Sequence, residues 1–114
     1  RIVLAIRAAS PNLIILGSRF YTQMIDEAAL DPVPGENLAY AIHFYAGTHG
    51  EFLRGRVRAA LDRGVAAFAS EWGLCEASGD GALAFEETCD WLSFLASRRI
   101  SWANWAISDK DEGC

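Results

Sequence analysis

The sequence is poor in cysteine, proline and methionine, with three, three and one residues among 114. Its cysteines, Cys75, Cys89 and Cys114, do not have the paired spacing of a structural zinc site. An odd number of cysteines also cannot close entirely into internal disulfides. One disulfide with a free thiol and three reduced cysteines are both open readings, so cysteine usage does not identify the redox compartment.

Long apolar runs and an excess of positive charge are also missing. The longest hydrophobic runs are a few residues, too short to cross a bilayer, so no membrane association is expected. Residues 1–7 lack a starting Met, a full apolar core and a cleavage site, so we expect no signal peptide here and a start inside a larger unit. The net charge is −5, and the cluster Arg54, Arg56 and Arg58 has the spacing of a solvated helix side. Nucleic acid is therefore not an expected partner.

What the sequence does contain is typical of one folded globular domain. Hydrophobic residues make up 52% of the chain and charged residues 22%. Strand-like runs bounded by turn residues alternate with segments whose apolar residues recur at helical spacing. The expected order is helix (2–9), strand (13–16), short helix, strand (38–45), helix, strand (65–70), helix, strand (100–106). This alternation predicts an α/β fold with a parallel sheet covered by helices.

Each of the last three predicted strands has one face that begins with small residues and ends with polar or aromatic ones. A narrow parallel barrel accommodates small side chains inside and gathers the C-terminal strand ends at one mouth, where active sites lie. We therefore expect Trp102, which has the opposite parity, to pack against helices. The residues of the inner face are expected to be Ala39, Ala41, His43 and Tyr45, then Ala67, Ala69 and Glu71, then Ser101, Ala103 and Trp105.

Four strands are half of an eight-stranded barrel. An open half leaves two parallel edges unpaired and buries little apolar surface for a monomer. The fold class predicted is therefore half of a (β/α)8 TIM barrel, completed either by self-association or by a segment outside this chain.

Three runs carry a resemblance to a known family. "AIHFYAGTHGEFL", "SEWG" followed by "EASGDG", and "ISWANWAISDKDE" resemble the C-terminal half of glycoside hydrolase family 5 endoglucanases, the bacterial cellulases. The resemblance runs from about Ile2 to Glu112. It implies that residues 1–114 begin within helix four and end after strand eight of the catalytic barrel. It also implies a retaining endo-β-1,4-glucanase that acts on β-1,4-glucan or cello-oligosaccharides, and a secreted parent protein.

The resemblance assigns catalytic roles to three residues. Glu71 matches the nucleophile at the end of strand seven. Tyr45 and His43 match a strand-six pair beside the cleavage point, with the tyrosine hydroxyl bonded to the nucleophile. Composition alone would make Glu71 a surface carboxylate at a strand end and His43 a buried core histidine. A nucleophilic carboxylate has to stay ionised, so hydrogen-bond donors beside it favour the catalytic reading.

The resemblance also assigns substrate contacts to six further positions. Without it, the charged run "SDKDEGC" would be interpreted as a solvated loop. The assigned residues are Trp105 as the sugar platform of subsite −1, Lys110 and Glu112 on the glycone side, Ala77 in the loop after strand seven, and Tyr21 and His49 on the aglycone side.

One part of the family pattern has no counterpart here. The Asn-Glu motif that carries the general acid/base, and the arginine and histidine of earlier strands, are missing from this sequence. We therefore expect the isolated chain to be weak or inactive, with no metal or cofactor required. The alternatives are a non-catalytic, self-assembling half-barrel that binds glucan weakly, and a related specificity for mannan or xylan. A disulfide between Cys75 and Cys114, both in mouth loops by this resemblance, is a further open pairing.

Overall fold

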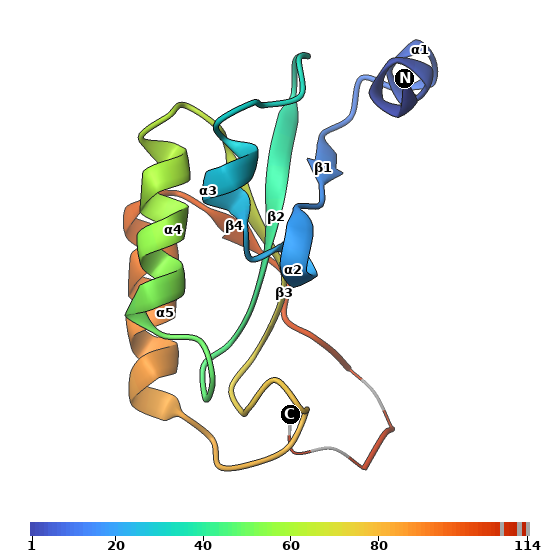
Figure 1. Ribbon diagram of the computed structural model, residues 1–114. Helices are drawn as coiled ribbons and strands as arrows, with labels where there is room; N and C mark the ends of the chain where they lie inside the picture. Colours follow the sequence, from blue (N-terminus) through green and yellow to red (C-terminus); the bar gives the residue numbers. More distant parts are fainter. Residues whose placement is uncertain (108, 112, 114) are drawn as a thin grey trace.

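The computed structural model of the chain describes residues 1–107, 109–111 and 113. Within these residues the strands form one sheet in the order β1-β2-β3-β4, and every neighbouring pair is parallel (Figure 1). The expected architecture of parallel strands with flanking helices is confirmed. In chain order the elements are α1 (Ile2–Ala9), β1 (Ile14–Leu16), α2 (Arg19–Thr22), α3 (Ile25–Ala28), β2 (Leu38–Tyr45), α4 (Glu51–Leu61), β3 (Ala67–Gly73), α5 (Phe85–Ser97) and β4 (Ser101–Trp102).

The core lies between the sheet and the helices α3, α4 and α5, on the side where Figure 1 shows α4 and α5 next to each other. Phe44 of β2 is fully buried, with its ring stacked on Trp91 of α5 at a centroid distance of 3.9 Å. The ring of Trp72, on the neighbouring strand β3, also stacks on Phe44, at a centroid distance of 5.6 Å. Leu53 and Val57 of α4 complete this cluster because their helical spacing places them on one face.

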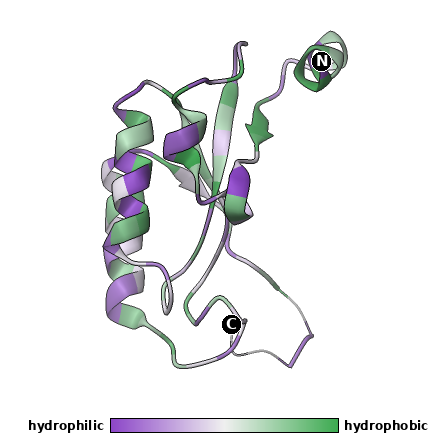
Figure 2. Ribbon diagram, in the orientation of Figure 1, coloured by the Kyte–Doolittle hydropathy of each residue, from purple (hydrophilic) through white to green (hydrophobic). Residues whose placement is uncertain are grey.

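Helix α1 lies away from that core, at the opposite end of the sheet in Figure 1. None of its residues is buried, although Ile2 and Leu4 are large apolar side chains exposed by 78% and 74%. An apolar groove of about 630 Å³ runs between α1, β1 and the segment Val33–Pro34. In Figure 2 hydrophobic residues colour both α1 and β1. This end of the molecule therefore has apolar side chains without a covering layer among the described residues.

A β-bulge in β3 changes which residues face the helices. Ile42 pairs with Ala69 but His43 pairs with Glu71, so Ser70 is an extra residue in β3. Ala69, before the bulge, belongs to the helix-side core, whereas Glu71, after it, lies opposite His43. The expectation that Ala67 and Ala69 share the inner face with Glu71 was wrong. For β2 the expected alternation is confirmed, since Tyr40, Ile42 and Phe44 belong to the core and His43 faces away from it.

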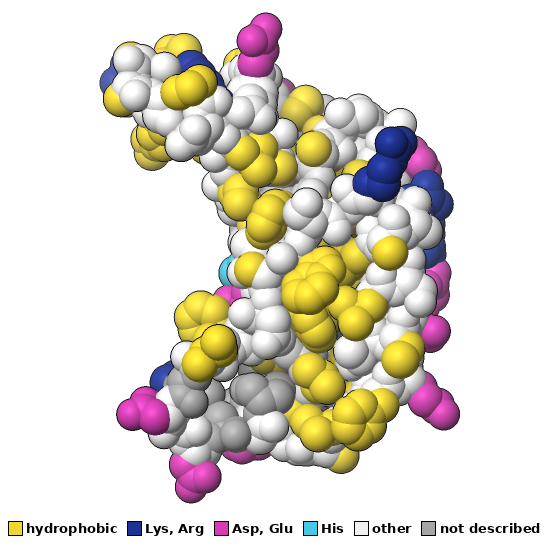
Figure 3. Space-filling model, turned by 180° about the vertical axis from the view of Figure 1, so that it is seen from behind, with side chains coloured by type: hydrophobic (Ala, Val, Ile, Leu, Met, Phe, Trp, Pro, Cys, Tyr) yellow, Lys and Arg dark blue, Asp and Glu magenta, His cyan; other side chains and the backbone are white. Residues whose placement is uncertain are grey.

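Apolar side chains are also exposed toward the last strand. Trp102 of β4 meets the ring of Trp72 edge-on at 5.3 Å, on the helix side as expected, yet 49% of its surface is exposed. Figure 3 shows apolar side chains gathered along this face of a molecule whose outline is hollowed on one side. None of the helices among residues 1–107 and 109–111 is long and apolar enough to span a membrane.

Candidate active site

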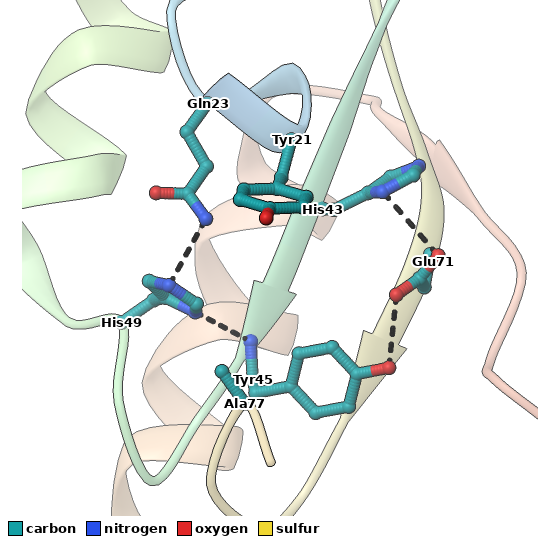
Figure 4. A pocket seen from close by; sticks show the side chains of 7 residues that line it. All are labelled: Tyr21, Gln23, His43, Tyr45, His49, Glu71 and Ala77. Carbon is teal, nitrogen blue, oxygen red and sulfur yellow. Dashed lines mark hydrogen bonds and ion pairs between the residues drawn. The ribbon is translucent and has the colours of Figure 1, made fainter. Parts of the chain in front are cut away.

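A cavity of about 400 Å³ opens where β2 and β3 end (Figure 4). It brings together residues separated by more than fifty positions in the sequence, because parallel strands deliver their C-terminal ends to the same edge. Six of the nine residues assigned from the sequence line it. The lining residues are Tyr21, Gln23, His43, Tyr45, His49, Glu71 and Ala77.

Glu71 lies at the centre of a set of polar side chains in this cavity. The Tyr45 hydroxyl donates to its Oε1 at 2.9 Å, and His43 Nδ1 lies 3.3 Å from its Oε2. Each carboxylate oxygen therefore has a partner on β2, the neighbouring strand. The Glu71 side chain is 26% exposed, so the carboxylate is held by these contacts while it remains open to the cavity.

Ser70 completes the set on the other side of His43. Its hydroxyl Oγ lies 3.0 Å from His43 Nε2. When the Ser70 hydroxyl donates to Nε2, the neutral ring carries its proton on Nδ1, the nitrogen that faces Glu71. Sequence reasoning missed Ser70 because simple alternation places it on the face opposite Glu71. Only the bulge brings the two consecutive side chains to the same histidine.

His49 lies in the loop after β2, with both ring nitrogens engaged. Its Nδ1 accepts the backbone N–H of Tyr45 at 2.9 Å, and its Nε2 lies 3.1 Å from the side-chain amide of Gln23. The His49 carbonyl accepts the indole N–H of Trp91 at 2.5 Å. Burial lowers the pKa of His49 below its ordinary value, because a charged ring loses solvation there.

The cavity rim is formed by loops that contact one another closely. The backbone N–H of Gly47 donates to the Cys75 carbonyl at 2.8 Å, and the Ala77 N–H donates to Thr48 Oγ1 at 2.9 Å. A side chain at Gly47 would have no room, since its Cβ would lie 2.8 Å from backbone atoms of Cys75. These contacts join the loop after β2 to the loop after β3.

Tyr21 reaches the rim from a strained segment. Phe20, Tyr21 and Thr22 have φ values of 54°, 53° and 60°, in the left-handed region that non-glycine residues rarely adopt. The expected short helix in this region is thus two short pieces, α2 and α3, with a left-handed turn in the first. Tyr21 remains 80% exposed, and its ring contacts that of Phe20 edge-on at 5.9 Å.

Comparison with known proteins identifies the family of this chain. The model of the cellulase family, glycosyl hydrolase family 5, matches residues 1–111. The chain belongs to this family. The resemblance predicted from the three sequence runs is therefore confirmed.

Individual family 5 proteins support the same conclusion. Endoglucanase Z of Dickeya dadantii is 50% identical over 113 residues, which are 98% of this chain and 26% of that protein. The catalytic domain of alkaline cellulase K has a TM-score of 0.94 at 40% identity, over 97% of this chain and 35% of that one. A variant of endoglucanase Cel5A from Thermobifida fusca, solved in complex with cellotetraose, has a TM-score of 0.89 at 29% identity over 97% of this chain and 39% of that one.

The alignments with these relatives cover almost all of this family 5 chain but only part of each relative. The chain spans about a quarter of the length of the curated relatives and about a third of the solved cellulases. It corresponds to a C-terminal part of a family 5 cellulase. The boundaries within helix four and after strand eight remain a prediction.

Trp105 and Lys110, among the described residues, do not line the cavity. The backbone N–H of Trp105 donates to the Trp72 carbonyl at 3.0 Å, which places this half-exposed residue beside the end of β3. Its peptide bond to Ala106 is cis. Lys110 is exposed in the C-terminal segment. Glu112, predicted to contact a glucose hydroxyl, falls outside the described residues.

The cysteines of the family 5 chain differ in their state, and its described residues offer no metal site. Cys75 is buried and disulfide-bonded, while Cys89 is an exposed free thiol. Cys114, the partner considered from the sequence, is outside the described residues. In the part of the chain that the structure describes, no group of three or more His, Cys, Asp or Glu side chains could hold a metal ion.

Proposed function

We propose that this chain carries the nucleophile half of the active site of a retaining endo-β-1,4-glucanase. The observation that supports this most directly is the ionisable Glu71 at a cavity mouth, with the Tyr45 hydroxyl and the His43 ring each within reach of one carboxylate oxygen. The family of the chain and the names of its relatives, which are endoglucanases, support the same reaction.

In this mechanism Glu71 attacks the anomeric carbon of a β-1,4-linked glucose unit. The bond to the leaving oxygen breaks, a proton passes to that oxygen from a second carboxyl, and a covalent glycosyl ester forms on Glu71. Water, activated by the same second carboxyl, then hydrolyses the ester with net retention. The Tyr45 hydroxyl and the His43 N–H orient the carboxylate before attack, and His43 itself is oriented by Ser70.

The second carboxyl has to lie about 5–5.5 Å from Glu71 in a retaining glycosidase. The Asn-Glu motif that carries this group in the family has no counterpart in this sequence. We propose that it comes from a complementing N-terminal half-barrel, which would pair with the open edges of β1 and β4. Loss of a proton-transfer group costs about 10²–10⁴-fold in rate, so hydrolysis by the chain alone should be very weak.

Substrate binding is proposed for the residues around the cavity. Tyr21 at the rim and Trp105 near the end of β3 offer ring faces to the apolar faces of sugar units. Lys110 and Glu112 would contact glucose hydroxyls on the glycone side, and Ala77 would contact the substrate from the loop after β3. The proposed substrate is a β-1,4-glucan or cello-oligosaccharide, consistent with the cellotetraose complex of a related cellulase. An extracellular location is proposed with it.

The decisive experiment uses a substrate whose cleavage does not depend on the missing general acid. A 2,4-dinitrophenyl 2-deoxy-2-fluoro-β-cellobioside has a leaving group that needs no protonation, so attack by Glu71 can be tested in the chain as it is. The expected result is a glycosyl adduct on the peptide that contains Glu71, detected by mass spectrometry, and no adduct in Glu71→Gln. A folded chain that never forms the adduct, or forms it on another residue, would overturn the proposal.

A second candidate is a non-catalytic assembly of half-barrels. The exposed Ile2, Leu4 and Trp102 side chains favour it, because two copies could cover such surfaces. Sedimentation of the purified chain distinguishes a monomer from an assembly, and the adduct experiment then tells whether that assembly keeps a reactive Glu71.

A further inference from the structure

We propose that His49 is a positioning residue, which uses its unprotonated Nδ1 to hold the backbone of Tyr45 so that the Tyr45 hydroxyl stays on Glu71. The inference rests on the proposed function for its catalytic consequence. It replaces the substrate contact expected for His49 with a role inside the protein.

The contacts of His49 leave its ring little freedom to serve a ligand. Figure 4 shows one ring nitrogen directed at the Tyr45 backbone and the other at Gln23. Because Nδ1 accepts an N–H, the neutral ring carries its proton on Nε2. That proton can be accepted by the Gln23 amide oxygen after a 180° turn of the amide, which exchanges its oxygen and nitrogen.

The backbone of His49 is held from the core. The indole N–H of Trp91 donates to the His49 carbonyl at 2.5 Å, and Trp91 is fully buried against Phe44. His49 thus connects the packed core to the last residue of β2. Without the ring, the N–H of the half-buried residue Tyr45 would lose this acceptor, which costs free energy and loosens the strand end.

His49 also connects the two sides of the cavity. Gln23 follows the left-handed turn that carries Tyr21, whereas Tyr45 is bonded to Glu71 on the opposite side. One imidazole therefore sets the distance between the proposed aglycone rim and the proposed nucleophile. A direct sugar contact by His49 would have to break one of these two bonds.

Protonation should release this arrangement. A charged ring has an N–H on Nδ1, which would point at the N–H of Tyr45 and could not accept from it. Burial lowers the pKa of His49, so the ring stays neutral at and above its ordinary value of 6.5. Because the pKa lies below that value, the bond to Tyr45 should be lost only as the pH falls below 6.5. The titratable or charged groups around the ring are Tyr21, Tyr45, His43 and Glu71 across the cavity, and the Glu87–Arg54 pair beside Gly50.

Two substitutions of His49 distinguish the role of its Nδ1 from that of its Nε2. In His49→Asn the side-chain oxygen takes the place of Nδ1 and can still accept from Tyr45, but the reach to Gln23 is lost. In His49→Gln the amide reaches the place of Nε2, and the acceptor for Tyr45 is lost. A substrate contact through Nε2 would make His49→Gln the milder change, whereas the positioning role makes His49→Asn the milder change.

The first test is nuclear magnetic resonance on the unmodified chain, which has two histidines to assign. We expect the Nε2–H tautomer of His49 and a through-hydrogen-bond coupling between its Nδ1 and the Tyr45 amide nitrogen. Amide exchange of Tyr45 should be slow in wild type and in His49→Asn and faster by about tenfold or more in His49→Gln. An Nδ1–H tautomer, or equal exchange in both variants, would overturn the proposal.

The second test is the rate of adduct formation on Glu71 with the fluorinated cellobioside. His49→Gln should react about tenfold more slowly than His49→Asn, and the fall in rate below pH 6.5 should be weaker in His49→Asn than in wild type. The reverse order of the two variants would overturn the positioning role. If wild type forms no adduct while the magnetic resonance results hold, the glucanase function fails and the His49–Tyr45 bond stands.

Discussion

Two regions of the molecule differ in how much of their apolar surface is covered. The packed region, formed by β2, β3, α4 and α5, contains Phe44, Val57, Trp91 and Leu95 with no exposed surface. The open region, formed by α1, β1 and α2, exposes Ile2, Leu4 and Phe20 by two thirds or more. The candidate site lies mainly in the packed region, with Tyr21 and Gln23 reaching it from the open side.

The difference indicates where the stability of this chain resides. Burial of apolar surface is the dominant favourable term in folding, so the packed region should supply most of it. The open region has the same apolar character without the cover. A half-barrel has this property because the strands and helices that would cover its open side belong to the rest of the barrel.

The largest effect should come from emptying the packed region. Phe44→Ala removes a fully buried ring stacked on Trp91 and should lower the free energy of unfolding by about 3–5 kcal/mol. Leu4→Ala in α1 should change it by only about 0.5 kcal/mol or less. Urea denaturation followed by tryptophan fluorescence measures both, with Phe44→Leu as a milder core variant.

A large loss in Leu4→Ala would contradict the comparison. It would mean that α1 is covered in solution, and the loss should then depend on protein concentration because a second copy supplies the cover.

The next effect concerns the loops that close the cavity. Gly47→Ala places a Cβ 2.8 Å from backbone atoms of Cys75 and should cost about 1–3 kcal/mol through overpacking. Gly55→Ala is the matched control, because its Cβ would meet only the Arg58 guanidinium at 3.7 Å in the interior of α4. It should raise the stability by about 0.5–1 kcal/mol. Equal effects in thermal unfolding would show that the loop contact at Gly47 is not tight.

A smaller effect is expected at the bulge. Ser70→Ala removes the hydroxyl that lies 3.0 Å from His43 Nε2, a contact of about 1 kcal/mol, so adduct formation on Glu71 should slow about fivefold. Ser70→Thr keeps the hydroxyl and should stay closer to wild type. The tautomer of His43 provides an independent readout. If Ser70→Ala leaves both the rate of adduct formation and the tautomer of His43 unchanged, Ser70 does not orient His43.

The smallest effect belongs to a surface ion pair of the open region. Arg19 Nη1 lies 3.1 Å from Glu27 Oε2, but the two side chains are 83% and 43% exposed. Arg19→Gln should change the free energy of unfolding by less than about 1 kcal/mol, and by less still in high salt. A larger loss would show that α2 and α3 are held together by charge and not by the buried Ile25.

The faces of β2 could be predicted from sequence, while those of β3 could not. In β2, Tyr40, Ile42 and Phe44 alternate with Ala41, His43 and Tyr45 without interruption. Parity alone therefore identifies the face of the site. In β3 the same rule failed, because an extra residue reverses the alternation after Ala69. A bulge depends on the pairing between two strands, and no local pattern in "AFASEWG" announces it.

The roles around Glu71 divide in the same way. Glu71, Tyr45 and His43 were expected together from family motifs, and the structure brings them within hydrogen-bond distance. Ser70 stands inside the "SEWG" run, but the resemblance assigned it no role, and Gln23 and Trp91 were likewise given none. They could be found only when distant segments were placed side by side.

The sequence by itself determined the alternation of helices and strands, the parallel sheet and the family, because periodicity and short motifs are local properties of the chain. Only the tertiary structure decided that Ser70 joins Glu71 on the inner face, and that both nitrogens of His49 are used inside the protein. Strand register and side-chain partners depend on segments far apart in sequence. Their energies are settled only when those segments pack against each other.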